Sequence, residues 1–204
     1  MESDLDREAL HRDIGAELLA ARAMVDQFLA DADAVARIAD AALLIAGVLA
    51  AGGKVVTCGN GGSMSDAMHF AAELSARFRQ SRPPLAAIAI CDPAYLSAAA
   101  NDFGYEQVFA RQIAALGNPG DLLMAISTSG NSPNVVKAVA AARRVGMRIV
   151  ALTAGAGGRL AGSADVEIRA PVSANPDRAQ EIHVKVLHIL AFLVERSLEA
   201  LPPR

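Results

Sequence analysis

The sequence predicts an α/β fold in which a five-stranded parallel sheet carries helices on both faces and follows a helical extension. From residue 53 onward, short apolar segments alternate with helical segments, a pattern typical of parallel sheets with crossover helices. At 204 residues the chain is long enough for one such domain, and no repeat or flexible linker divides it. We expect one domain over 1–204, with N-terminal helices over 1–52 and an α/β core over 53–204.

Two helical stretches precede the first expected strand. Apolar residues recur near the helical period between residues 10 and 28, and a second helical pattern covers about 33–51. Gly52 and Gly53 then end that second helix. The first helix has no obvious strand to cover, so it packs either against another subunit or on the sheet of its own chain.

The remaining elements alternate between strand and helix. The apolar segments expected as strands are 54–58, 85–90, 122–126, 147–152 and 166–168. The segments expected as helices between and after them are 64–78, 105–116, 133–145 and 176–198.

Composition excludes several classes of protein. Apolar residues make up 53% and charged residues 20%, as in globular proteins, and a net charge of -3 offers no broad basic surface for nucleic acid. The acidic N-terminus does not resemble a secretion signal, and the longest apolar run, 41–51, is too short to span a bilayer. We expect a cytoplasmic protein with no nucleic-acid or membrane partner. Cys58 and Cys91 are expected as free buried thiols.

Two polar loops each follow an expected strand directly. The first is Cys-Gly-Asn-Gly-Gly-Ser at 58–63, and the second is Ser-Thr-Ser-Gly-Asn-Ser at 127–132. Such turns lie at the carboxyl ends of parallel strands, where glycines let the backbone approach a ligand and helix N-termini favour anions. Neither loop matches a nucleotide-binding motif. The hydroxyls of the second loop favour a sugar phosphate, and the alternative is that they only cap a helix.

Two pairs of polar residues lie on two expected helices. His69 and Glu73 are four residues apart and share one helix face, and Gln180 and His188 are about two turns apart on the last helix. Imidazole and carboxylate are good zinc ligands, whereas an amide oxygen is a weak one. Taken singly, His69 is better explained as a partly buried structural residue and Glu73 as a solvated charge than as metal ligands.

The two loops resemble those of the sugar isomerase (SIS) domain family. The similarity to this family covers nearly the whole chain. Together with the sequences His-Phe-Ala-Ala-Glu at 69–73 and Gln-Glu-Ile-His at 180–183, followed by His188, they resemble the bacterial sedoheptulose 7-phosphate isomerases. The resemblance implies one zinc ion per subunit bound by His69, Glu73, Gln180 and His188, with Glu73 and His188 as the catalytic acid and base. The substrate contacts that it implies are Asn60, Gly61, Gly62, Glu73, Asn101, Asp102, Ser127, Thr128, Ser129, Ser132 and Gln180.

The resemblance also implies the reaction and the assembly. Sedoheptulose 7-phosphate would become D-glycero-D-manno-heptose 7-phosphate through an enediol, the first step of bacterial heptose synthesis, in a homo-oligomer expected to be a tetramer. Two alternatives remain: a non-catalytic relative that resembles the replication initiator-associating protein, which typically has a small residue in place of Glu73, and an SIS isomerase for another sugar phosphate.

Some residues near these motifs depart from the family pattern or have no assigned role. Ala179 and the segment 172–177 depart from it, which leaves substrate preference open. His183 is expected to be structural, because it projects about 60° from the direction of Gln180. Arg77 either orients a carboxylate or the ligand or is a surface charge.

Overall fold

The computed structural model describes residues 6–199, and the rest of the expected 1–204 domain lies outside them. Its centre is a five-stranded sheet in the order β2-β1-β3-β4-β5, and every neighbouring pair of strands is parallel. The predicted α/β class and the number and direction of the strands are confirmed. The strands are β1 (Val55–Gly59), β2 (Ala87–Ala89), β3 (Leu122–Ile126), β4 (Arg148–Ala154) and β5 (Val166–Ala170).

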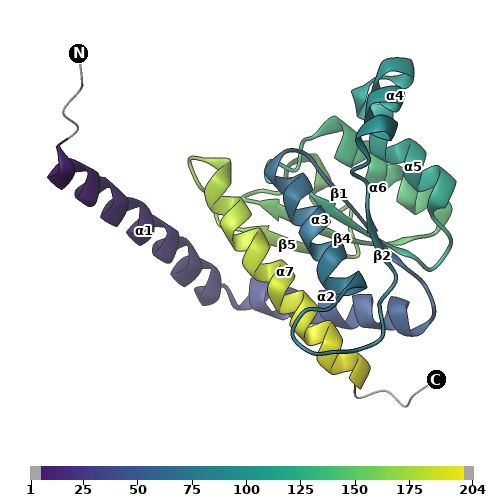
Figure 1. The fold of residues 1–204 in the computed structure, drawn as a ribbon, viewed down its shortest axis with the longest axis horizontal. Coiled ribbons are helices and arrows are strands. Elements are labelled where there is room, and N and C mark those ends of the chain that lie inside the picture. The colour runs from purple at the N-terminus through teal and green to yellow at the C-terminus, as the bar shows by residue number, and fades with distance from the viewer. Residues whose placement is uncertain (1–5, 200–204) are drawn as a thin grey trace.

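Helices cover both faces of the sheet (Figure 1). Successive side chains of a strand point to opposite faces, so Met124 packs in one core cluster with α2, α3 and α7, while Leu123 packs in the other with α4, α5 and α6. The α-helices are α1 (Arg7–Ala30), α2 (Ala32–Ala50), α3 (Gly62–Ser75), α4 (Pro93–Phe103), α5 (Val108–Leu116), α6 (Pro133–Val145) and α7 (Pro176–Glu199), and short 3-10 helices cover Tyr105–Gln107 and Gly158–Leu160.

Three local predictions need correction. Residues 93–103, for which no helix was predicted, form α4, because Asp92 caps the helix through the N–H of Tyr95 and Pro93 occupies its first turn. The strand expected over 85–90 is limited to Ala87–Ala89, at an edge of the sheet with one neighbour. Cys58 is buried as expected, but Cys91 is only half-buried.

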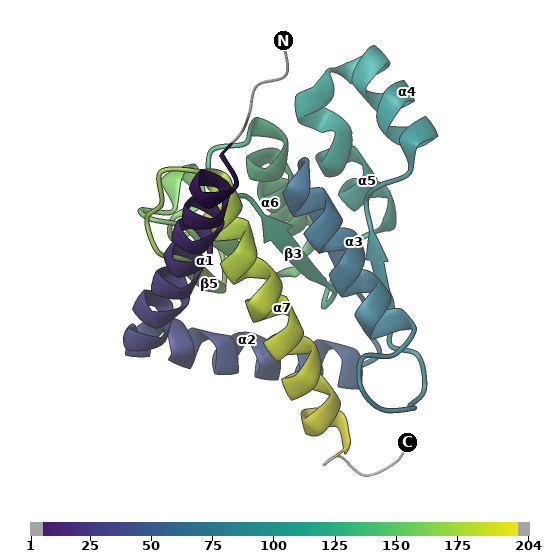
Figure 2. The ribbon, with the colours of Figure 1, turned by 60° about the vertical axis from the view of Figure 1, so that its left-hand side comes forward.

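Helix α1 extends away from the sheet as an arm (Figures 1 and 2). Met24 and Phe28, near its end, are buried, whereas Leu10, Ile14 and Leu18 are 40%, 56% and 68% exposed. The alternative in which this apolar stripe lies on its own sheet is therefore wrong for the first part of the helix. Within residues 6–199, no helix has both the length and the apolar character needed to cross a membrane.

Asp121 ties β1 and β3 together at the amino edge of the sheet. Its carboxylate accepts hydrogen bonds from the backbone N–H and the side-chain ammonium of Lys54 and from the N–H of Asn118. Burial alone would raise the pKa of Asp121, but these hydrogen bonds outweigh burial and hold its pKa below the ordinary value. The tie supports the register that pairs Val55 with Leu122.

Candidate active site

The two polar loops leave neighbouring strands at the same edge of the sheet. Gly59 at the end of β1 is in register with Ile126 at the end of β3, so Asn60 and Ser127 each follow a strand end. Helices α3 and α6 begin directly after these loops. The sequence prediction that both loops share the carboxyl edge is confirmed, and two helix N-termini point toward this edge.

The second loop, residues 127–132, is called the serine-rich loop and has a defined hydrogen-bonding pattern. The hydroxyl of buried Ser127 donates to the hydroxyl of Ser132 at 3.1 Å, and the hydroxyl of Ser129 accepts from the N–H of Asn131 at 3.1 Å. Ser132 is the N-cap of α6, yet its side chain makes no capping hydrogen bond. Capping thus does not explain its hydroxyl, and exposed Ser129 and half-buried Thr128 face outward from the fold.

Gly130 allows this loop to pack tightly against the turn that follows β4. Its φ is +62°, and a Cβ atom placed there would lie 1.9 Å from the carbonyl oxygen of Gly157. Both the backbone conformation and the close approach therefore require glycine.

Helices α3 and α7 bring the predicted histidine and glutamate residues together. The Nε2 atoms of His69 and His188, which are 119 residues apart in the sequence, lie 2.7 Å from each other. The Nε2 atom of His69 is 3.5 Å from Oε1 of Glu73, one turn further along α3. The two rings meet edge to face, with centroids 5.0 Å apart. At this distance one ring carries its proton on Nε2 and the other accepts it.

Gln180 approaches the first loop from the start of α7. A Cβ atom at position 62 would lie 2.6 Å from the Oε1 atom of Gln180, so any larger residue there would displace this amide. The structure thus places Gln180 beside Gly62, at the N-terminus of the helix that carries His69 and Glu73.

The chemistry of this donor set fits a zinc ion. Two imidazoles, a carboxylate and an amide oxygen are ligands that zinc accepts, and tetrahedral zinc holds two nitrogen ligands about 3.4 Å apart. The Nε2 atoms of His69 and His188 are closer than that, at 2.7 Å. Within residues 6–199, no three His, Cys, Asp or Glu side chains are already arranged around one metal position. The rings of His69 and His188 would have to move apart for both to bind one ion.

Residues beyond the predicted set support this cluster. The ring of Phe78 stacks on His188 with centroids 5.7 Å apart. Arg82 donates to the carbonyl of Glu73 at 2.8 Å and pairs with the buried carboxylate of Glu195 on α7 at 2.8 Å. This ion pair fastens the end of α3 to α7. No pattern in the sequence indicates this pair, because the partners are 113 residues apart.

Asp66 is a buried carboxylate on α3, one turn before His69. Burial raises the pKa of Asp66 to about 6, and His69 opposes this shift. Its Oδ2 atom has no hydrogen-bond partner among the described residues. The sequence analysis missed Asp66, although its spacing of three from His69 places both on one side of the helix.

Three other side chains have structural or surface positions. His183 is buried, and its Nε2 atom lies 2.9 Å from the carbonyl oxygen of Thr153, consistent with the structural role expected for it. Burial lowers the pKa of His183 and favours its neutral form. Burial also raises the pKa of the Cys58 thiol to about 12, so this thiol is not a nucleophile. Arg77 is exposed.

Asn101 and Asp102 lie at the end of α4. Both are exposed, and within the described part of the chain their only side-chain hydrogen bond joins them to each other, at 2.9 Å. The structure does not link these two predicted substrate contacts to the other site residues.

Two cavities border the serine-rich loop. One, of about 290 Å³, is lined by Thr128 and Ser129 and by Ala179 with the segment 172–176. The other, of about 460 Å³, is lined by Asn60, Ser132 and their neighbours. The positions at which this sequence departs from the family pattern therefore lie beside the predicted phosphate site, where they can influence substrate preference.

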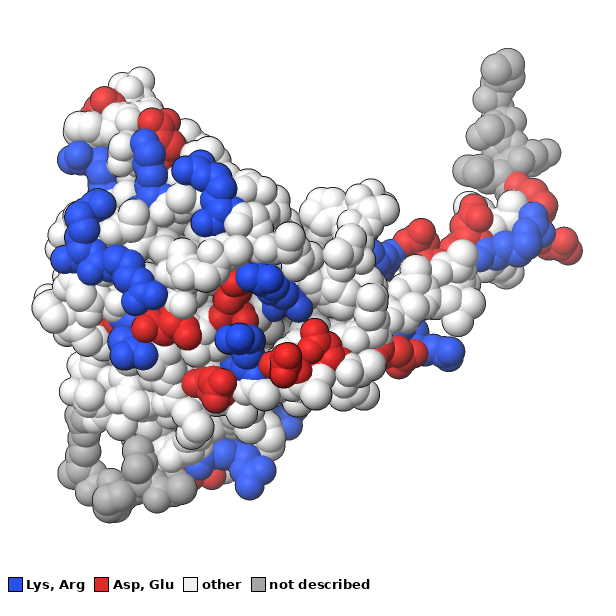
Figure 3. Space-filling view, turned by 180° about the vertical axis from the view of Figure 1, so that it is seen from behind, with Lys and Arg blue, Asp and Glu red and all other residues white. Residues whose placement is uncertain are grey.

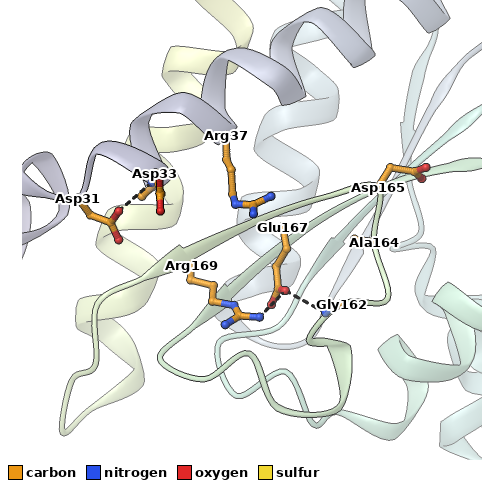
Figure 4. Close-up of a pocket in the computed structure, with 9 residues that line it drawn as sticks. Asp31, Asp33, Arg37, Gly162, Ala164, Asp165, Glu167 and Arg169 are labelled. Atoms are coloured by element: carbon orange, nitrogen blue, oxygen red, sulfur yellow. Dashed lines mark hydrogen bonds and ion pairs between the residues drawn. The ribbon is translucent and has the colours of Figure 1, made fainter.

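A further cavity, of about 280 Å³, lies between the start of α2 and β5 (Figure 4). None of the predicted site residues lines it. Several of its charged groups already have partners: Glu167 pairs with Arg169 at 2.8 Å, and Asp31 caps α2 through the N–H of Ala34. These pairings leave it a weaker candidate for the active site than the carboxyl edge of the sheet.

Charged side chains of both signs occupy the rear of the molecule (Figure 3). Among the ion pairs of the described residues, Arg143 and Arg148 both contact Asp165, at 3.1 and 3.2 Å. This distribution agrees with the small net charge and offers no uniformly basic face in this view.

Comparisons with known proteins identify the family. The SIS domain family matches residues 20–154. The chain is 55% identical to the phosphoheptose isomerase of Sodalis glossinidius over 184 residues, which cover 90% of this chain and 95% of that protein. It is 52% identical to the phosphoheptose isomerase of Klebsiella pneumoniae over 198 residues, which cover 97% and 98% of the two chains.

Solved structures agree with these matches. The phosphoheptose isomerase of Neisseria gonorrhoeae superimposes with a TM-score of 0.85 at 36% identity, covering 92% of this chain and 99% of that one. That of Francisella tularensis gives 0.81 at 38% identity, covering 96% and 100%. The shared fold and the identity of 52–55% to two phosphoheptose isomerases over at least 90% of the chain show that it belongs to the phosphoheptose isomerase family of SIS-domain proteins.

Proposed function

We propose that this chain is an isomerase that interconverts sedoheptulose 7-phosphate and D-glycero-D-manno-heptose 7-phosphate. The observation that carries the proposal is the contact between His69 and His188, which joins two helices beside the polar loops. Family membership supports the same reaction, since the relatives named above are phosphoheptose isomerases. An aldose–ketose isomerisation moves a proton between C1 and C2 and needs one acid and one base near the reacting carbons.

The proposed roles follow from the side chains present. Glu73, half-buried at the end of α3, is the proposed base that transfers the proton between the two carbons. His188 is the proposed partner that exchanges protons with the sugar oxygens, and the reverse assignment is the alternative. Ser127, Thr128, Ser129 and Ser132 would bind the phosphate, with the start of α6 adding its positive dipole end.

We further propose that His69, Glu73, Gln180 and His188 hold one zinc ion per subunit. When bound, zinc would polarise the carbonyl and hydroxyl oxygens of the substrate as a Lewis acid. The support for this proposal is the donor set itself and the fold, which brings His69 and Glu73 on α3 next to His188 on α7.

Metal analysis of the purified protein tests the zinc proposal. Wild-type protein should contain about one zinc per subunit, and His188→Ala should lose most of it, because an imidazole ligand contributes much of the affinity. His11→Ala is the matched control, since His11 is exposed on α1, and it should keep its zinc. Full occupancy in His188→Ala would remove His188 from the ligand set.

Turnover of sedoheptulose 7-phosphate, followed with and without a chelator, tests the reaction. We expect conversion that stops on chelation and returns with zinc. Arabinose 5-phosphate serves as the competing substrate, and preferential conversion of it would favour the alternative of another sugar-phosphate isomerase. Absence of turnover with either sugar would favour the non-catalytic relative.

We also propose that the active form is a homo-oligomer, with a tetramer as the expected state. The exposed apolar stripe of α1 supports it, because a helix that projects from its own domain gains burial only from another chain. The cytoplasmic location expected from the sequence stays a prediction.

A further inference from the structure

The side-chain oxygen of Asn60 is fully engaged within the protein. Asn60 is the first residue after β1, and its Oδ1 atom accepts hydrogen bonds from Nδ2 of Asn134 at 2.8 Å and from the hydroxyl of Tyr105 at 3.1 Å. An amide oxygen has two lone pairs, so these two donors satisfy it. Asn60 therefore has no free acceptor to offer a ligand.

The side-chain nitrogen of Asn60 is only half engaged. Its Nδ2 atom donates one hydrogen to Oδ1 of Asn134 at 2.9 Å. An amide NH₂ group has two hydrogens, and no other acceptor for them is found among the described residues. Asn60 thus presents one N–H donor, which suits a phosphate or hydroxyl oxygen.

Asn134 is itself held in a single orientation. It is 2% exposed and occupies the first turn of α6, and its Oδ1 atom also accepts from the N–H of Val135 at 3.0 Å. Rotating the amide by 180° would place its NH₂ group against two N–H donors, so the orientation is fixed. The reciprocal amide pair thus connects the loop after β1 to the helix after the serine-rich loop.

We propose that Asn134 and Tyr105 are positioning residues that hold the amide of Asn60 as an N–H donor to the sugar phosphate. This role rests on the proposed function and on the substrate contact that the family resemblance implies for Asn60. Both residues line the cavity of about 460 Å³ beside Asn60 and Ser132. Each acts through Asn60, so their removal should weaken substrate binding without removing a reacting group.

A double-mutant cycle separates this role from a structural one. Asn134→Ala and Asn60→Ala should each raise the KM for sedoheptulose 7-phosphate about tenfold, as expected for one hydrogen bond to a charged group, with a smaller change in kcat. The double variant should be no worse than Asn60→Ala alone, because both changes remove the same contact. Additive losses in the double variant would overturn the positioning role.

Two further variants control for the fold. Tyr105→Phe removes one exposed hydroxyl and should raise KM severalfold even if Asn134→Ala folds poorly. Val136→Ala trims α6 at a half-buried position outside the amide pair and should leave KM unchanged. Unchanged KM in Tyr105→Phe and Asn134→Ala would overturn the proposal.

Calorimetry that measures the binding of sedoheptulose 7-phosphate separates a failure of the proposed isomerase reaction from a failure of the proposed positioning role. Wild-type protein that binds without turnover would count against the isomerase reaction alone, and weaker binding by Asn134→Ala would still support positioning. Equal binding by wild type and Asn134→Ala would overturn positioning alone. Failure of the wild type to bind would count against both.

Discussion

At the scale of single residues, the candidate site depends on side chains that are held by neighbours outside it. His188 is flanked by the ring of Phe78 and contacts His69, while the carbonyl of Glu73 accepts a hydrogen bond from Arg82. Supporting contacts of this kind limit the movement of a reacting group and keep it near a productive geometry. The surroundings of the acid and base therefore contribute to the proposed reaction together with the groups themselves.

Replacing Glu73 with glutamine tests its role in proton transfer. Glutamine keeps the shape of the side chain but cannot accept the proton, so kcat should fall by a factor on the order of hundreds. Steady-state kinetics measures the effect, and zinc content determined on the same sample separates loss of the base from loss of metal. A near-normal kcat would exclude Glu73 as the base.

Replacing Asp121 with asparagine should change the dependence of stability on pH. Because hydrogen bonds hold its folded pKa below the ordinary value, Asp121 stabilises the fold above the unfolded pKa near 4, and this contribution is lost as pH falls through the folded pKa. Asp121→Asn should therefore cost about 1–3 kcal/mol near neutral pH and progressively less in acid.

Urea unfolding of wild type and Asp121→Asn between about pH 2 and pH 7 measures this difference. Asp40→Asn is the control, because Asp40 is exposed on α2 and makes no side-chain hydrogen bond among the described residues. A stability difference between wild type and Asp121→Asn that stays constant across the pH range would contradict the assignment.

At the scale of elements, the sequence predicted the helices and strands that have a clear pattern of apolar residues or clear terminating residues such as glycine and serine. The five strands and the serine-rich turn into α6 follow from apolar runs bounded by glycine and serine. Helix α4 was missed because three consecutive alanines, 98–100, weaken the helical periodicity of its apolar residues, although Asp92 and Pro93 are typical of a helix start. The Arg82–Glu195 and Asn60–Asn134 pairs could not be predicted, because contacts between distant residues leave no periodic pattern.

A double substitution in the serine-rich loop tests whether its hydroxyls bind the phosphate. Ser127→Ala combined with Ser129→Ala should raise KM for the sugar phosphate at least tenfold, because both hydroxyls are proposed to bind the phosphate. The change in stability should be small, because among the described residues the Ser127 hydroxyl donates only to Ser132 and the Ser129 hydroxyl accepts only from the N–H of Asn131. Ser163→Ala with Ser197→Ala is the matched control, because those hydroxyls bond to nearby backbone carbonyls. Unchanged KM in the loop variant, with normal stability, would reject the phosphate assignment.

At the scale of the whole molecule, α1 is hard to explain in an isolated chain. Its stripe of Leu10, Ile14 and Leu18 is exposed, and an ion pair between Glu17 and Arg178 joins the helix to α7 near the start of that helix. An arm fixed at its base and apolar along one side is suited to pairing with the same helix of a second copy. Pairing of this kind would place the neighbouring chain close to α7, the helix that carries Gln180 and His188.

The last prediction is that association through α1 is required for full activity. Light scattering should give wild-type protein a mass about four times the 21.1 kDa of the chain. Ile14→Glu combined with Leu18→Glu should reduce that mass and lower kcat/KM, because charges in an apolar interface oppose pairing. Ala16→Glu with Ala23→Glu adds the same charge on the opposite side of the helix and should disturb the mass less. A stable wild-type monomer with full activity would show that every group needed for the reaction comes from one chain.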